Sequence, residues 1–224
     1  MRYLITQSLL SSWTYMLSCR EECQEDASQE FMNALLRIHK PATPEMQNGI
    51  YFENLVYTIA DGRFKLDTVP NGAAEAMGDT IITETPKYPK WYKGANAVAT
   101  IIKGAPVQVK ASRELSVGSM DLLLYGILDA LKAGTIYDVK FSNKSFGSAE
   151  LAGKYLDSPQ HSAYFYLIPE AHTFKYLVSD GEDLYTETYT RDATIPFPEL
   201  AKMFLTSLEA MRLLDVYKEH WKSR

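Results

Sequence analysis

Two long apolar strands joined by a very short turn constrain the fold more than any other feature of the sequence. The first, SMDLLLYGILDAL at residues 119–131, is hydrophobic at both sets of alternating positions, so it needs packing layers on both faces. Only residues 132–134 separate it from TIYDVKFSN at 135–143, which indicates a hairpin with a tight turn. With VQVKASREL at 107–115 as a third antiparallel strand, the pattern predicts the centre of an α/β sandwich.

Helical periodicity surrounds these strands on both sides in the sequence. Before them, we expect helices at residues 8–18, with Gln7 or Ser8 as cap, at 31–38, at 45–62, and at 73–103 with interruptions at Pro86 and Pro89. After them, we expect a short helix at 159–168, strands at 172–180 and 183–191, and one long closing helix at 197–221. No repeat or long linker divides the chain, so residues 1–224 are expected to form a single domain with a helical N-terminal lead-in.

Composition excludes several classes of protein. With 224 residues, 46% of them hydrophobic, the chain can close one sizeable core, which rules out disordered and fibrous classes. The net charge of −5 argues against a uniformly basic nucleic-acid binder. Cys19 and Cys23 are too few for a disulfide framework or a four-thiolate metal site. No run approaches the ~18 apolar residues of a membrane span, so we expect a cytoplasmic protein.

Two carboxylates meet across the predicted hairpin. Centring the turn between Ala133 and Gly134 sets Asp129 opposite Asp138, with Cβ atoms about 4.5–5.5 Å apart. Lys140, two residues along, shares that face. Two such carboxylates repel unless a cation lies between them, and carboxylate oxygens suit Mg²⁺ or Mn²⁺. The pattern favours metal-assisted phosphodiester chemistry, and the alternative is a surface ion pair between Asp138 and Lys140.

Four short motifs extend this pattern along the chain. They are GIYFE at 49–53 on a predicted helix, YGILD at 125–129 and YDVK at 137–140 on the hairpin, and QHSAY at 160–164 on the following helix. In this order they resemble the PD-(D/E)xK nuclease superfamily, in its RecB-like and lambda-exonuclease-like branch. The resemblance spans roughly residues 4–190 and implies a restriction-endonuclease-like sandwich with a central mixed sheet flanked by helices.

The resemblance also implies roles for individual residues. A metal site would consist of Glu53, Asp129, Asp138 and the carbonyl of Val139, beside the ammonium of Lys140. Gln160 and Tyr164 would contact the substrate or brace the site. Many RecB-like members have His where Glu53 stands, so direct ligation by Glu53 stays open. The iron-sulfur subgroup has four cysteines, and with two this chain is not expected to hold a cluster.

The implied activity is that of a metal-dependent DNA nuclease using Mg²⁺ or Mn²⁺. We expect an exonuclease of phage or bacterial recombination or repair, acting on a duplex end or a single strand. A homo-oligomer and a recombination partner protein are compatible with this branch of the family, and a membrane is not expected.

A local basic segment suggests where DNA would lie. From Pro86 to Arg113 there are six bases and no acid, and rings alternate with lysines in KYPKWYK at 87–93. Bases that track phosphates and rings that stack on nucleobases suit a single strand or a frayed end. The candidate DNA-binding residues are Lys87, Lys90, Trp91 and Lys93. The alternative is a solvated helix start that Trp91 anchors in the core.

Two other interpretations remain open. The chain could keep a nuclease fold and bind nucleic acid or a partner without cutting, although Asp129, Asp138 and Lys140 are all present. It could also be an unrelated α/β protein in which Glu53 lies far from the hairpin. His161 adjoins Gln160 and could face the site, but a helix surface position is the expectation.

Overall fold

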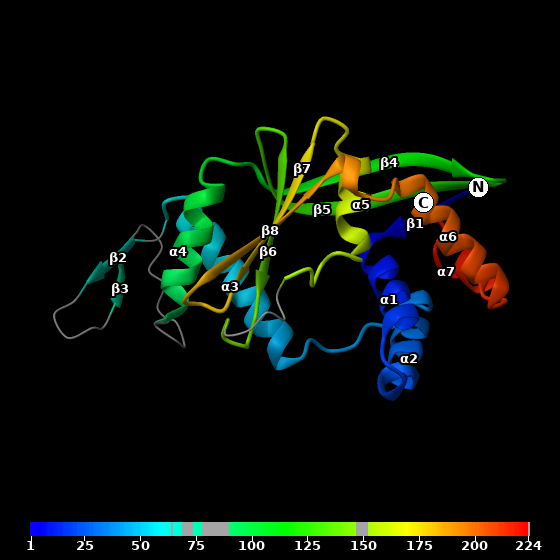
Figure 1. Cartoon of the computed structure of the whole chain (residues 1–224), viewed down its shortest axis with the longest axis horizontal. Helices are drawn as coiled ribbons and strands as arrows, with labels where there is room; N and C mark the ends of the chain where they lie inside the picture. The colour runs from blue at the N-terminus through cyan, green and yellow to red at the C-terminus, as the bar shows by residue number, and fades with distance from the viewer. Residues whose placement is uncertain (64, 69–73, 78–89, 147–151, 224) are drawn as a thin grey trace.

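A central mixed sheet organises the molecule (Figure 1). The computed structural model describes residues 1–63, 65–68, 74–77, 90–146 and 152–223. The sheet has six strands, in the order β1 (Arg2–Thr6), β5 (Met120–Lys132), β6 (Thr135–Phe141), β7 (Thr173–Ser179) and β8 (Leu184–Thr190), with β4 (Val107–Val117) also paired to β5. The pairs β1–β5 and β6–β7 are parallel, and the others are antiparallel. The expected mixed sheet is confirmed.

The hairpin of β5 and β6 forms as predicted. Lys132 pairs with Thr135 across the turn, and the two turn residues, Ala133 and Gly134, have φ of 48° and 72°. Left-handed φ at both positions characterises the two-residue type I′ turn, whose twist matches that of the strands. The strand β1 was not predicted, because its few residues run directly into a helix.

Helices cover the two faces of the sheet in two separate hydrophobic clusters. One cluster contains α1 (Gln7–Ser18), α2 (Gln24–Leu35), α5 (Pro159–Leu167), α6 (Phe197–Ala210) and α7 (Leu214–His220). The other contains α3 (Pro44–Ala60) and α4 (Lys90–Ile102), packed on Ala130, Val139 and Leu177 of the sheet. Figure 1 shows α3 and α4 at one end and α1, α2, α6 and α7 at the other. Layers on both faces are what the apolar character of β5 required.

Several boundaries differ from those predicted. The closing helix is broken into α6 and α7, because Arg212 adopts a left-handed φ of 60°. The second helix begins at Gln24, earlier than expected, and α1 is capped by Thr6, whose Oγ1 accepts from the amide of Leu9 at 3.4 Å. Short 3-10 helices occupy Glu21–Cys23 and Arg191–Ala193.

The segment expected to be helical at 73–103 is only partly so. Ala74–Met77 forms β3, which pairs with β2 (Lys65–Thr68), and a helix is described only as α4 from Lys90 onward. Pro86 and Pro89 lie outside the described residues. None of the described helices combines the length and apolar character that a membrane crossing requires.

One edge of β5 is interrupted midway along the strand. Because β4 pairs along the whole opposite edge, β1 and β6 share the remaining one, where β1 pairs with 121–125 and β6 with 130–132. Among the described residues, 126–129 have no strand partner on this edge. Helix α5 lies against this gap, and the Tyr164 hydroxyl donates to the carbonyl of Ile127 at 2.8 Å.

Gly126 makes this close approach of helix and strand possible. A Cβ at this position would lie 2.9 Å from Cε1 of Tyr164 and 2.8 Å from Cδ1 of Leu167. Side chains of α5 therefore occupy the space that any other residue at this position would need.

We predict that Gly126→Ala destabilises the protein by about 1–3 kcal/mol, because the added methyl overpacks the α5 contact. Gly49→Ala is the matched control: Gly49 is helical and a Cβ there meets nothing within 4 Å. That variant should gain about 0.5–1 kcal/mol from helix propensity. Urea unfolding of both variants measures the difference, and equal effects would contradict the packing described for α5.

Candidate active site

Asp129 and Asp138 come together where β5 and β6 part. The pairing of the two strands runs from the turn to Ala130 and Tyr137. It stops one position short of Asp129 on β5 and of Asp138 on β6. They are therefore adjacent, as the register predicted, but not as a ladder pair. Instead, Oδ2 of Asp129 accepts a hydrogen bond from the amide of Val139 at 2.7 Å. A side chain thus supplies the acceptor that the partner strand no longer offers.

Asp138 is almost fully buried, with 2% of its side chain exposed. Its Oδ1 accepts a short hydrogen bond from Nε2 of Gln160, and its Oδ2 lies 2.6 Å from Nζ of Lys140. The Oδ2 atom is buried, and its partner is the Lys140 ammonium, in an ion pair. The Lys140 side chain reaches outward from this contact and is 37% exposed.

The charges in this cluster do not balance. Burial, then the Asp138 carboxylate and then Glu53, raise the pKa of Asp129 well above its usual value, although Lys140 and the Val139 amide oppose the rise. Burial alone would lower the pKa of Lys140, but the two aspartates outweigh it and raise that pKa. One protonated lysine therefore faces two carboxylates, which leaves a demand for further positive charge.

Glu53 reaches the neighbourhood of the cluster from α3. Its Oε1 accepts from the Tyr57 hydroxyl at 2.6 Å and from Nε2 of Gln108 at 2.9 Å. Glu53 is near enough to raise the pKa of Asp129. Within the described residues, however, no three His, Cys, Asp or Glu side chains are grouped so that they could hold one metal ion. Direct ligation by Glu53 stays a prediction.

The two aspartates themselves fit a hard divalent cation. They offer carboxylate oxygens in a site where one ammonium faces two carboxylates. Mg²⁺ and Mn²⁺ prefer such oxygens and complete their coordination with water. Ligation by the Val139 carbonyl remains a prediction, since the contact that the structure gives for Val139 is through its amide.

Helix α5 supplies the two bracing side chains of the QHSAY motif. The helix starts at Pro159 after Ser158, whose Oγ accepts from the amide of Gln160 at 3.3 Å. Gln160 and Tyr164 are each 5% exposed, and they bond to Asp138 and to the backbone of β5 respectively. Burial raises the pKa of Tyr164, so it stays a neutral donor. Through these contacts, Gln160 and Tyr164 connect α5 to Asp138 and to the backbone of β5.

His161 does not occupy the helix surface position that the sequence suggested. It is 5% exposed, its ring stacks on Tyr189 with centroids 4.5 Å apart, and Nδ1 lies 3.5 Å from the Tyr176 hydroxyl. Burial lowers the pKa of His161 to about 4. It is a neutral core residue whose contacts are aromatic.

Sequence reasoning missed three residues around the cluster. Tyr57 and Gln108 hold Glu53, and Tyr155 stacks on Tyr176 with centroids 4.1 Å apart, close enough to Lys140 to influence its pKa. The position of Tyr57, four residues after Glu53 on one helix face, was a readable signal. Nothing in the sequence marked Tyr155.

The predicted DNA-binding segment is only partly described. Lys87 and the side chain of Lys90 lie outside the described residues. Trp91 is 4% exposed and its ring packs on Phe141, with centroids 4.5 Å apart, so the expectation that it stacks on nucleobases is wrong. The burial of Trp91 agrees with the alternative, in which Trp91 anchors the start of the helix in the core. Lys93 is exposed, with Nζ 3.7 Å from a carboxylate oxygen of Asp183.

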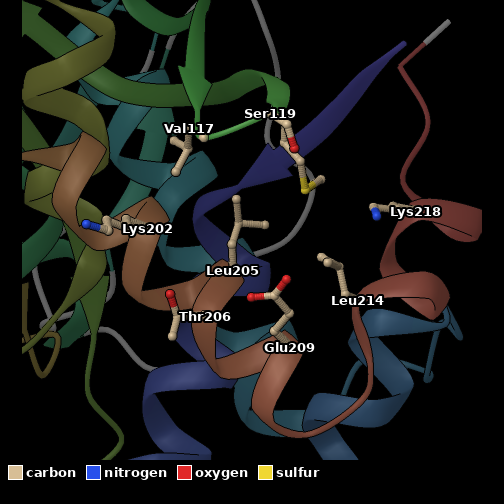
Figure 2. A pocket seen from close by; sticks show the side chains of 10 residues that line it. Val117, Ser119, Lys202, Leu205, Thr206, Glu209, Leu214 and Lys218 are labelled. Atoms are coloured by element: carbon tan, nitrogen blue, oxygen red, sulfur yellow. The ribbon is translucent and has the colours of Figure 1, made fainter.

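A separate cavity of about 310 Å³ lies between the β4–β5 turn and helices α6 and α7 (Figure 2). Its polar lining includes Ser119, Lys202, Glu209 and Lys218. None of the residues that line it belongs to the carboxylate cluster.

Comparisons with known proteins find only distant likenesses. No family model matches the chain, and no curated protein sequence matches it. Among solved structures, SSO0001 is similar with a TM-score of 0.46 and 15% identity, over 94% of this chain and 76% of that one. LHK-Exo in complex with dAMP has a TM-score of 0.41 and 13% identity, over 92% and 88%. Scheffersomyces stipitis Rai1 has 0.31 and 9%, over 93% and 76%.

We predict that His161 makes the protein acid-sensitive. Because its pKa falls from 6.5 to about 4 on folding, the unfolded chain binds a proton that the native chain does not. Stability should be full above pH 6.5 and fall by roughly 3 kcal/mol as the pH drops to 4. Urea unfolding of His161→Gln should show a shallower loss, whereas the exposed His39→Gln control should follow the wild type. Identical slopes in all three would contradict the burial of a neutral imidazole.

Proposed function

We propose that this protein is a metal-dependent deoxyribonuclease that hydrolyses phosphodiester bonds. The observation that carries the proposal is the cluster at the parting of β5 and β6, where the carboxylates of Asp129 and Asp138 lie near the Lys140 ammonium, which is 2.6 Å from Asp138. Bound Mg²⁺ or Mn²⁺ would supply a Lewis acid and an activated water. Asp129 and Asp138 would hold the ion, and Glu53 would lie beside it.

The other side chains have distinct roles in this proposal. Lys140, which is partly exposed, would hold the attacking water or offset negative charge that grows on the phosphate. Its ammonium has donors only, so it acts beside the ion and does not bind it. Gln160 would fix the orientation of Asp138, and Tyr164 would fix β5 through the carbonyl of Ile127.

The finer assignment is supported by the motif resemblance to the PD-(D/E)xK superfamily. On that basis we propose an exonuclease of phage or bacterial recombination or repair, acting in the cytoplasm on a duplex end or a single strand. A homo-oligomer and a recombination partner belong to the same proposal. The second candidate, a nuclease fold that binds DNA without cutting, would leave unexplained why the carboxylates and Lys140 are assembled.

The first prediction from the proposed function concerns the bound Mg²⁺ or Mn²⁺ ion. In EDTA at pH 7.5, Asp129→Asn should be more stable than the wild type, by on the order of 1 kcal/mol. Because folding raises the pKa of Asp129, the native protein loses stability as the pH rises from the ordinary aspartate pKa to the raised pKa. The neutral side-chain amide of the Asp129→Asn variant removes this loss. The amide oxygen can still accept from Val139.

Added Mn²⁺ should reverse the order. Mn²⁺ at 100 times its Kd should stabilise the wild type by about 2.7 kcal/mol, with little effect on the variant. Asp215→Asn, at a carboxylate that is 99% exposed, is the control and should respond to Mn²⁺ as the wild type does. An equal Mn²⁺ response of wild type and Asp129→Asn in calorimetry would place the ion elsewhere.

The second prediction separates cleavage from binding. Lys140→Ala should keep Mn²⁺ and DNA binding within a few-fold, while cleavage of linear or single-stranded DNA falls about a hundredfold, roughly 3 kcal/mol in the barrier. Lys140→Arg should not restore the rate, because the planar guanidinium cannot occupy the same point-charge position.

Lys202→Ala, at an exposed position of α6, is the control and should cleave at the wild-type rate. If Lys140→Ala also cleaves at that rate, Asp138 and Lys140 form only a structural ion pair. If the wild type binds DNA but never cuts it, the binding protein is the correct alternative.

A further inference from the structure

Gln108 has an unusual backbone conformation inside β4. Its φ is 52°, in the left-handed region that residues other than glycine, asparagine and aspartate rarely adopt. Its neighbours Val107 and Val109 pair with Ala130 and Leu128, which sets Gln108 across from Asp129. Such a conformation persists only where the surroundings hold it, and it re-aims the side chain relative to an ordinary strand.

The re-aimed side chain reaches α3. Nε2 of Gln108 donates to Oε1 of Glu53 at 2.9 Å and to the Tyr57 hydroxyl at 2.8 Å. The same hydroxyl donates to Oε1 at 2.6 Å, so the three groups close a ring of hydrogen bonds. Both donors use Oε1. The ring therefore holds Glu53 through one of its two carboxylate oxygens.

We propose that Gln108 is a positioning residue of the nuclease site. Gln108 lies across from Asp129 on β4, and its hydrogen bond connects this position to Glu53 of α3. With Tyr57, Gln108 would hold Glu53 near Asp129, where its carboxylate would contribute to metal binding through a bridging water. The inference rests on the proposed function and deepens it, since sparsely populated backbone conformations cluster at functional sites.

Gln108→Asn tests the proposal directly. Asparagine tolerates left-handed φ, but its side chain is one methylene shorter and cannot reach Glu53 as Gln108 does. The variant should melt within about 3 °C of the wild type. Its half-saturating Mn²⁺ concentration in cleavage, and its Mn²⁺ Kd by calorimetry, should rise about tenfold or more, as when an outer-shell partner of a metal ligand is removed. The rate at saturating Mn²⁺ should recover to within about threefold.

Two further variants serve as a control and as a second test of the proposal. Arg212→Asn makes a matched control, since Arg212 has a φ of 60° and lies exposed at the end of α6, and it should leave the Mn²⁺ requirement unchanged. Gln108→Glu keeps the length but places a second carboxylate where the donor was, and should also raise the Mn²⁺ requirement. It provides the measurement if Gln108→Asn fails to fold.

The outcomes separate this inference from the proposed function. If the wild type binds Mn²⁺ and cleaves, but the Gln108 variants have an unchanged Mn²⁺ requirement, the positioning role is wrong and the nuclease stands. A rate loss that excess Mn²⁺ does not restore would assign Gln108 to structure alone. If the wild type neither binds Mn²⁺ nor cleaves, the proposed function falls, and this inference with it.

Discussion

The parting of β5 from β6 is the constraint on which the rest of the structure depends. The two strands stay paired for only a few residues after a turn that requires left-handed φ at Ala133 and Gly134. Beyond it, backbone groups on both strands need other partners. The Asp129 carboxylate satisfies the amide of Val139, and Tyr164 of α5 satisfies the carbonyl of Ile127. The side chains of Asp129 and Tyr164, which replace the missing strand partners, are thereby held where β5 and β6 separate.

Burial makes it energetically costly to keep both Asp129 and Asp138 ionised. Asp138 is held in the core by Gln160 and Lys140, and its charge raises the pKa of Asp129. A cluster with more carboxylate than ammonium favours cations, whether a metal ion or a proton. Helix α5, which packs closely on Gly126, also holds Asp138 through the Gln160 hydrogen bond.

The sequence predicted the parts that depend on local pattern. The alternating apolar residues of β5, the short turn and the helix after Ser158 were all readable, and so was the meeting of Asp129 with Asp138. It did not predict β1, whose five residues gain their pairing from β5, or the break at Arg212. Nor did it predict Gln108, because its role depends on a backbone angle and on a helix 55 residues away. The stacking role assigned to Trp91 failed because a ring beside lysines can equally turn inward.

The division of the interior into two hydrophobic clusters bears on how the chain acquires its chemistry during synthesis. Glu53 comes from a helix of one cluster, and Gln160 and Tyr164 come from a helix of the other. A partly folded chain with only one cluster packed lacks either Glu53 or the support for Asp138. Under the proposed function, a copy in which only one cluster has packed would lack part of the site and would not cleave nucleic acid.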